Sequence, residues 1–449
     1  MTTTVAPVTF GQLSVLRSLE PVAPEDLPRR NQLRLWRVPP GTSDETVHAT
    51  LRLLAGRHEG LRTRFTGTSQ IVDPGHGPDP EPQDATWTTH SDALERMRGL
   101  GRRGFALDRE YGWRAQPLTG TDGTPGYVAV SLHHMLVDRY ALDRLTREFN
   151  SLVRDGAAAV TGPARSVVEL AEQQRGEGWA TRRRRSMEYL RTILADDSRP
   201  RTAPPSGRIE VRRLSTAAAP HLAAASTALA VSAQAIMLAL SALICAQLRG
   251  TGRPLIGLMA SNRLIPAWQA MVTSMNQRTW AALDVTADTD FADLARRASL
   301  ASLTAFRHGC YDVDELTRLS DEVGPMPAID CSLNVMKQEP GINTPERPAP
   351  DGDTWVSPKV HGGAPVELKV FQGPQQRTNL RIDPRLCTPG DLLAVLDWCD
   401  ARLAVGALSK LRMRMFWLCH PARLILRQQS ESKYSPLCSS RLSRRRQKK

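Results

Sequence analysis

Residues 127–143 read YVAVSLHHMLVDRYALD and decide the fold. The first six residues follow the pattern of a β-strand, in which neighbouring side chains point to opposite faces of a sheet. His133 and His134 come next, so we expect their rings to point in different directions, which argues against a two-histidine metal site. Asp138 stands where a helix N-cap is expected, ahead of an amphipathic pattern. The stretch predicts a strand, a turn with one structural and one chemically available histidine, and a helix.

Length and composition favour a soluble protein with two domains. The chain has 449 residues, of which 41% are hydrophobic and 23% charged. Its first twelve residues, MTTTVAPVTFGQ, lack the basic and apolar regions of a secretory signal. The 7 cysteines show no close pairing, which fits free thiols in a reducing compartment. We therefore expect a cytoplasmic protein.

The net charge of +13 belongs to the C-terminal end. Residues 401–449 hold 13 of the 59 Lys and Arg residues but only one of the 46 acidic residues, Glu431, which leaves 46 basic and 45 acidic residues before them. A basic tail attracts polyanions, but no aromatic-basic recognition motif accompanies it. We expect no specific nucleic-acid partner. Residues 405–449 are interpreted as a disordered or non-native tail, with a polyanion-binding arm as the alternative.

Further patterns lie on both sides of the histidines. A helical pattern over residues 42–55 leads into RHEGLRTRF at residues 57–65, where the period changes to two and predicts a strand. Residues 196–207, DDSRPRTAPPSG, have the composition of a linker and mark the domain boundary. The apolar residues 221–248 are predicted to form one buried core helix rather than a membrane span, because glutamine and serine interrupt them. A long helix is predicted over residues 166–194.

HHMLVDR resembles the His-His-x-x-x-Asp-Gly motif of the chloramphenicol acetyltransferase-like superfamily, which includes the condensation domains of nonribosomal peptide synthetases. RHEGLRTRF is similar to the motif Arg-His-x-x-Leu-Arg-Thr-x-Phe of these domains, and residues 231–263, 271–277 (MVTSMNQ) and 307–316 (RHGCYDVDEL) resemble their later motifs. The resemblance covers roughly residues 8–404. The shared order of the motifs carries its specificity.

This resemblance implies an α/β (α+β) fold of two chloramphenicol acetyltransferase-like lobes, arranged as a V-shaped pseudo-dimer with a central active-site tunnel. The N-terminal lobe would span residues 1–195 and carry the histidines. The C-terminal lobe would span residues 208–404.

The resemblance also assigns roles to residues. His134 takes the catalytic position, where a neutral imidazole can accept or orient a proton of the attacking group. His133, Asp138 and Arg62 take supporting positions. Arg62 would pair with Asp138 through bidentate bonds, and loss of one partner of such a buried pair costs about 3–5 kcal/mol.

The chain departs from the family pattern directly after Asp138, where Arg139 replaces glycine. A long cation there would narrow the tunnel, shift the helix start, or bind a carboxylate or phosphate of the substrate. Asn276 aligns with an asparagine of the family, and we take Arg139 and Asn276 as candidate tunnel residues. Some superfamily members with altered motifs are inactive.

The resemblance therefore predicts a free-standing condensation-type acyltransferase that forms an amide or ester bond in nonribosomal peptide biosynthesis. The donor would be a phosphopantetheine thioester on an acyl or peptidyl carrier protein supplied in trans, and the acceptor a small amine or alcohol. It implies a monomer with no bound cofactor, no metal and no membrane partner. Two alternatives stay open: an acyltransferase of the same fold that uses acyl-CoA, and a catalytically degenerate interaction protein.

Overall fold

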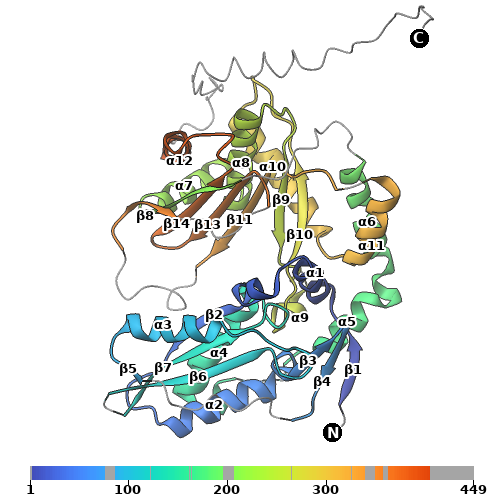
Figure 1. Ribbon diagram of the computed structural model, residues 1–449. Helices are drawn as coiled ribbons and strands as arrows, with labels where there is room; N and C mark the ends of the chain where they lie inside the picture. Colours follow the sequence, from blue (N-terminus) through green and yellow to red (C-terminus); the bar gives the residue numbers. More distant parts are fainter. Residues whose placement is uncertain are drawn as a thin grey trace, which may run out of the picture. The chain divides into compact units, whose positions relative to one another are not determined.

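The computed structural model of the protein describes residues 3–75, 86–121, 123–160, 162, 164–195, 207–263, 265–324, 326–338, 349–356 and 363–404 (Figure 1). All of these residues lie within one unit of the chain, residues 1–413. The predicted linker, apart from its last residue, and the whole of the basic tail lie outside the described residues.

The first half of the chain builds two sheets of its own. One has four strands in the order β2-β7-β6-β5, and a smaller antiparallel sheet has the order β1-β4-β3. The strands are β1 (Thr4–Pro7), β2 (Gln32–Arg37), β3 (Thr63–Thr66), β4 (Ser69–Val72), β5 (Thr86–Trp87), β6 (Trp113–Gly120) and β7 (Pro125–Leu132). The helices are α1 (Phe10–Leu19), α2 (Asp44–Arg57), α3 (His90–Gly101), α4 (Arg139–Asp155), α5 (Val167–Arg175) and α6 (Ala180–Leu194), with short 3-10 helices η1 (Pro24–Arg30), η2 (Glu59–Arg62), η3 (Ala157–Ala159) and η4 (Glu177–Trp179).

Strand β7 confirms the alternation predicted for residues 127–132, and both of its faces are buried. Tyr127 and Ala129 pack with α3, whereas Val128 and Val130 join the core formed with α2 and α4 (Figure 1). When helices cover both faces of a strand, nearly all of the residues in its sequence are apolar. The strand therefore holds the histidines that follow it on a rigid support.

Helix starts follow the predicted caps, but two boundaries differ from the sequence pattern. Ser43 caps α2, and Asp138 caps α4. The long helix predicted over residues 166–194 is two helices, α5 and α6, because Gly176 has an extended backbone and ends the first of them. The predicted strand at residues 61–65 begins only at Thr63, because the residues before it form the 3-10 helix η2.

The second half builds a single seven-stranded mixed sheet in the order β10-β9-β11-β13-β14-β8-β12. Strand β11 runs parallel to both of its neighbours, β9 and β13, and the other pairs are antiparallel. The strands are β8 (Ile209–Ser215), β9 (Leu255–Ala260), β10 (Gln277–Ala282), β11 (Cys331–Lys337), β12 (Gly352–Val356), β13 (Val366–Gln372) and β14 (Gln376–Ile382). The helices are α7 (Ala218–Leu229), α8 (Ala233–Arg249), α9 (Pro266–Gln269), α10 (Phe291–Arg307), α11 (Val313–Val323) and α12 (Pro389–Ala404). One face of the sheet forms the main core with α7, α8, α10 and α12.

The apolar run predicted as one helix at residues 221–248 is two helices, α7 and α8. Ala230 has a left-handed backbone (φ 52°) that ends α7, and Ser232 caps α8. No single described helix is long and apolar enough to span a bilayer, and α7 and α8 meet this measure only as a pair bent by 98°. Helix α8 is buried along most of its length, as a core helix should be.

A segment of the second half, residues 271–277, reaches into the first half and is called here the crossing segment. Gly11 in α1 packs on its backbone, and a Cβ at Gly11 would lie 2.5 Å from the Cα of Met275. A Cβ at Gly60 would lie 2.7 Å from the carbonyl oxygen of Val272. The side-chain amide of Gln12 donates to Thr273 Oγ1 at 3.1 Å. Glycines therefore allow two backbones to approach closely at this junction.

We predict that Gly11→Ala destabilises the protein because its methyl group would overlap the backbone of the crossing segment. Overpacking of this kind costs about 1–3 kcal/mol. Urea unfolding measures the loss. The matched control is Gly99→Ala in α3, where a Cβ would meet no atom within 4 Å. The control should keep or slightly raise stability, since alanine is the better helix former. An equal loss in both variants would contradict the close contact.

Candidate active site

The two histidines lie in the turn between β7 and α4 and differ in their surroundings. His133 is buried, its backbone N–H donates to the Gly112 carbonyl at 2.7 Å, and its ring meets Phe105 edge-on. His133 Nδ1 accepts the backbone N–H of Met135 at 3.2 Å. Burial and, to a smaller degree, the charge of His134 lower the pKa of His133 to about 4. His133 is therefore a neutral, structural histidine at physiological pH.

His134 is half-buried and has one ring nitrogen engaged. Its Nδ1 lies 2.9 Å from the carbonyl oxygen of Val137. A carbonyl oxygen only accepts hydrogen bonds, so Nδ1 carries the hydrogen, and Nε2 of the neutral ring keeps its lone pair. The arrangement presents a fixed tautomer that can accept a proton at Nε2. This is the chemical property that a general base requires.

Asp138, the N-cap residue of α4, holds this turn in place through its carboxylate. Its carboxylate receives both guanidinium ends of Arg263, at 2.6 and 2.9 Å, and both side chains are only 3% exposed. It also accepts backbone N–H groups from Ala141 in α4 and from Met275 and Asn276 in the crossing segment, at 2.9, 3.0 and 3.2 Å. A single carboxylate thus joins the helix start, the end of β9 and the crossing segment.

Burial alone would raise the pKa of Asp138, but the positive charge and hydrogen bonds of Arg263, together with the backbone donors, lower it below its ordinary value. Asp138 is therefore an ionised scaffold residue. Its position also sets that of the neighbouring carbonyl of Val137, which holds His134.

The predicted pair between Arg62 and Asp138 is wrong. Arg62 ends the 3-10 helix η2 instead of lying in a strand, and its guanidinium donates to the backbone carbonyl of Asp73. Arg263 takes the place that was predicted for Arg62. The sequence shows Arg263 only as the second residue of an Asn-Arg pair after the strand β9. Nothing local in that pair reveals a partner 125 positions away.

Asn262 produces the backbone bend that comes directly before Arg263. Asn262 has a left-handed backbone (φ 56°), which asparagine tolerates better than most residues. Its buried side-chain amide donates to the carbonyls of Met275 and Gly309, at 2.9 and 3.0 Å. The bend lets Arg263 turn from the sheet toward Asp138.

The structure brings Asn276 and Arg139 to the same cluster. Asn276 reaches Asp138 through its backbone N–H, and its side-chain oxygen accepts from Ser274 at 3.2 Å. Arg139 is the first residue of α4, and Asp138 keeps its capping role, so the replacement of glycine does not shift the helix start. Arg139 Nε donates to Asp143 at 2.7 Å.

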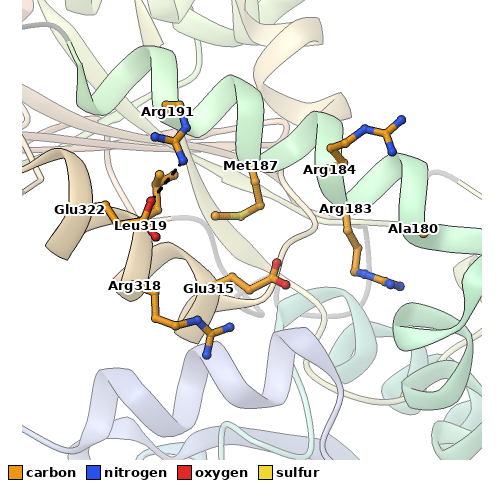
Figure 2. Close-up of a pocket in the computed structure, with 9 residues that line it drawn as sticks. All are labelled: Ala180, Arg183, Arg184, Met187, Arg191, Glu315, Arg318, Leu319 and Glu322. Carbon is orange, nitrogen blue, oxygen red and sulfur yellow. Dashed lines mark hydrogen bonds and ion pairs between the residues drawn. The ribbon is translucent and has the colours of Figure 1, made fainter.

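One pocket on the described part of the surface lies away from the histidine turn. The pocket in Figure 2 is formed by α6 and α11 and has a volume of about 390 Å³, and its charged lining residues are Arg183, Arg184, Arg191, Glu315, Arg318 and Glu322. Arg191 and Glu322 form an ion pair of 3.3 Å across it. No residue of the histidine turn lines this pocket. Because of the hydrogen bonds of His134 and Asp138, we assign the catalytic chemistry to the histidine turn instead.

A double-mutant cycle identifies the true partner of Asp138. Asp138→Asn and Arg263→Gln should each cost about 3–5 kcal/mol, because each strands a buried charge. The double variant should lose clearly less than the sum, since the two groups are coupled. The same cycle with Arg62→Gln should show no coupling. Urea unfolding measures all variants, and coupling to Arg62 instead of Arg263 would refute the assignment.

Stability should fall in acid because of His133. The unfolded histidine titrates near 6.5 and the folded one at about 4, so the unfolded state binds the proton first as the pH drops. This contribution is complete above pH 6.5 and is lost between pH 6.5 and 4, by up to about 3 kcal/mol. Denaturant unfolding at pH 7 and pH 5 should show a smaller loss for His133→Gln than for the unchanged protein. Equal losses would contradict the buried neutral imidazole.

Solved structures share this fold. The condensation domain that mediates chain release from the enacyloxin polyketide synthase is 16% identical over 92% of this chain and 85% of its own, with a TM-score of 0.70. The starter condensation domain of rhizomide synthetase, solved as a mutant with C8-CoA and Leu-SNAC, is 17% identical over 92% and 97%, with a TM-score of 0.68. The X-domain from teicoplanin biosynthesis, in complex with OxyB, is 19% identical over 91% and 93%, with a TM-score of 0.63. These likenesses confirm the predicted mixed α/β fold, and the V-shaped arrangement of lobes stays a prediction.

No curated protein matches the chain significantly. The family model described as the condensation domain matches residues 31–347, which is more than half of the 449 residues. The match includes the histidine turn, Arg263 and the crossing segment. The chain therefore belongs to the condensation-domain family.

Proposed function

We propose that the protein is a condensation-type acyltransferase, which joins an acyl group from a carrier-protein thioester to a small amine or alcohol. The observation that carries the proposal is the bond from His134 Nδ1 to the Val137 carbonyl, which leaves Nε2 available to accept a proton. Membership of the condensation-domain family supports the same chemistry.

The reaction needs one proton acceptor and a well-placed acceptor group. The nitrogen or oxygen of the acceptor forms a bond to the thioester carbonyl carbon, and the carbon–sulfur bond breaks. The proton leaves the attacking atom for His134 Nε2 and is passed to the departing thiolate, so the imidazole ends neutral. Holding both reactants near this nitrogen contributes to the rate as well.

The scaffold around His134 supports a competent site. Asp138 remains ionised and bonded to Arg263, and α4 starts at Arg139 without backbone strain. The substitution of glycine by Arg139 thus changes the chemistry of the side chain while the turn keeps its anchor. This favours activity over the degenerate alternative.

Two alternatives each have a specific observation in their favour. The rhizomide starter domain was solved with C8-CoA, which favours an acyl-CoA donor for a protein of this fold. The teicoplanin X-domain was solved with OxyB, which favours an interaction role. The donor and the need for His134 separate the three hypotheses.

We predict that the full chain forms product from a carrier-bound acyl thioester and that His134→Ala lowers the rate by about 10²–10⁴-fold, the usual contribution of a general base. Mass spectrometry of reactions with a panel of amines and alcohols measures it, and acyl-CoA donors are run in parallel. His221→Ala, a half-buried histidine of α7, is the matched control and should keep full activity.

Product from acyl-CoA alone would shift the assignment to the second hypothesis. An unchanged rate in His134→Ala would refute the catalytic role. The absence of product with every donor and acceptor, from protein shown to be folded by circular dichroism, would favour the interaction protein.

A further inference from the structure

The seven-stranded sheet has a polar face opposite its main core. On β14, Arg377, Asn379 and Arg381 share this face, because side chains alternate along a strand. The register places Arg212 of β8 opposite Asn379, and Phe371 of β13 opposite Arg377. Residues in register lie on the same face. Arg212 and Arg377 are therefore diagonal neighbours.

Acidic residues neutralise the other arginines of these strands. Arg381 bonds to Glu210 and Glu367, at 2.6 and 2.9 Å. On the opposite face, Arg213 contacts three aspartates, and its side chain is only 13% exposed. The fold thus supplies carboxylates wherever it buries an arginine on these strands, with one exception.

That exception is the pair formed by Arg212 and Arg377. Among the described residues, neither forms an ion pair, and the buried Nε of each has no hydrogen-bond partner. The guanidinium carbon of Arg377 lies over the ring of Phe371, 3.7 Å from the ring centre. This cation–π contact does not use the hydrogen-bond donors of the guanidinium.

A third arginine, Arg139 of α4, acts on the pair through its charge. Burial lowers the pKa of Arg377, and the positive charges of Arg212 and Arg139 lower it further. Arg139 shares the carboxylate of Asp143 with Arg34, and its buried Nη2 has no partner among the described residues. Two cations with unused donors thus share one sheet face, and a third at the start of α4 also keeps a donor unused.

We propose that Arg139, Arg212 and Arg377 form an oxyanion-binding site for a carboxylate or phosphate group of a substrate. An oxyanion would fill the unused donors and relieve the repulsion among three cations, and planar guanidinium groups match its geometry. The inference rests on the proposed function of His134, because the site would orient a substrate toward that residue. The anion would be either a carboxylate of the acyl or acceptor molecule or the phosphate of the pantetheine arm.

Ligand-observed NMR on the full chain tests the site without turnover. The probes are N-acetylglycine as a carboxylate, inorganic phosphate, and N-acetylglycinamide as the uncharged control. The double variant Arg212→Gln/Arg377→Gln should bind the preferred anion at least tenfold more weakly, and each single variant at least threefold. Arg377→Lys keeps the charge and should lose less. Arg102→Gln/Arg296→Gln removes two exposed arginines, whose side chains are 73% and 61% exposed, and should bind like the unchanged protein.

The two anions separate the two sources. Preference for N-acetylglycine indicates a substrate carboxylate, and preference for phosphate indicates the pantetheine arm. Equal binding by the double variant, an equal loss in the exposed control, or equal binding of N-acetylglycinamide would overturn the proposal. Thermal unfolding confirms that each variant is folded, and the single variants serve if the double variant is not. Because binding is measured directly, an inactive protein that binds the anion would refute only the function proposed for His134.

Discussion

The buried pair between Asp138 and Arg263 is the interaction on which the rest of the site depends. Two charges that are each 3% exposed are removed from water, which is favourable only when their hydrogen bonds are nearly complete. Asp138 meets that condition with two guanidinium and three backbone donors. Those donors come from α4, from the residues after β9 and from the crossing segment, so satisfying one carboxylate requires all three to be in place.

The same anchor explains how adjacent histidines acquire different chemistry. Val137 precedes the anchored residue, and its carbonyl holds the Nδ1–H of His134. His133 turns inward, where burial keeps it neutral and the backbone N–H of Met135 occupies its Nδ1. The different roles of His133 and His134 follow from hydrogen bonds within a turn of a few residues. A rigid strand and a capped helix keep that turn in position.

The distribution of arginines is the basis of the proposed anion-binding site. Two of the four arginines on β8 and β14, Arg213 and Arg381, are matched by carboxylates. Arg212, Arg377 and one nitrogen of Arg139 keep unused donors. Arg139, at the start of α4, stands where the motif that this chain resembles has glycine, and it is the one member of the proposed anion site that the sequence pointed to.

The features that depend on local physics could be predicted from the order of residues alone. Alternation identified β7, the short polar side chain of Asp138 identified the start of α4, and the order of motifs identified the mixed α/β fold. Each of these signals lies within a few residues, where periodicity and capping act.

Which distant groups meet could be seen only in the folded protein. The partner of Asp138 is 125 positions away, and a strand pattern at residues 61–65 pointed to Arg62 because it did not reveal the 3-10 turn that redirects that side chain. The left-handed backbone at Ala230 splits one apolar pattern into two helices, and the register of β8 with β14 places Arg212 beside Arg377. Contacts of this kind arise from the packing of distant segments, and no local pattern of residues encodes them.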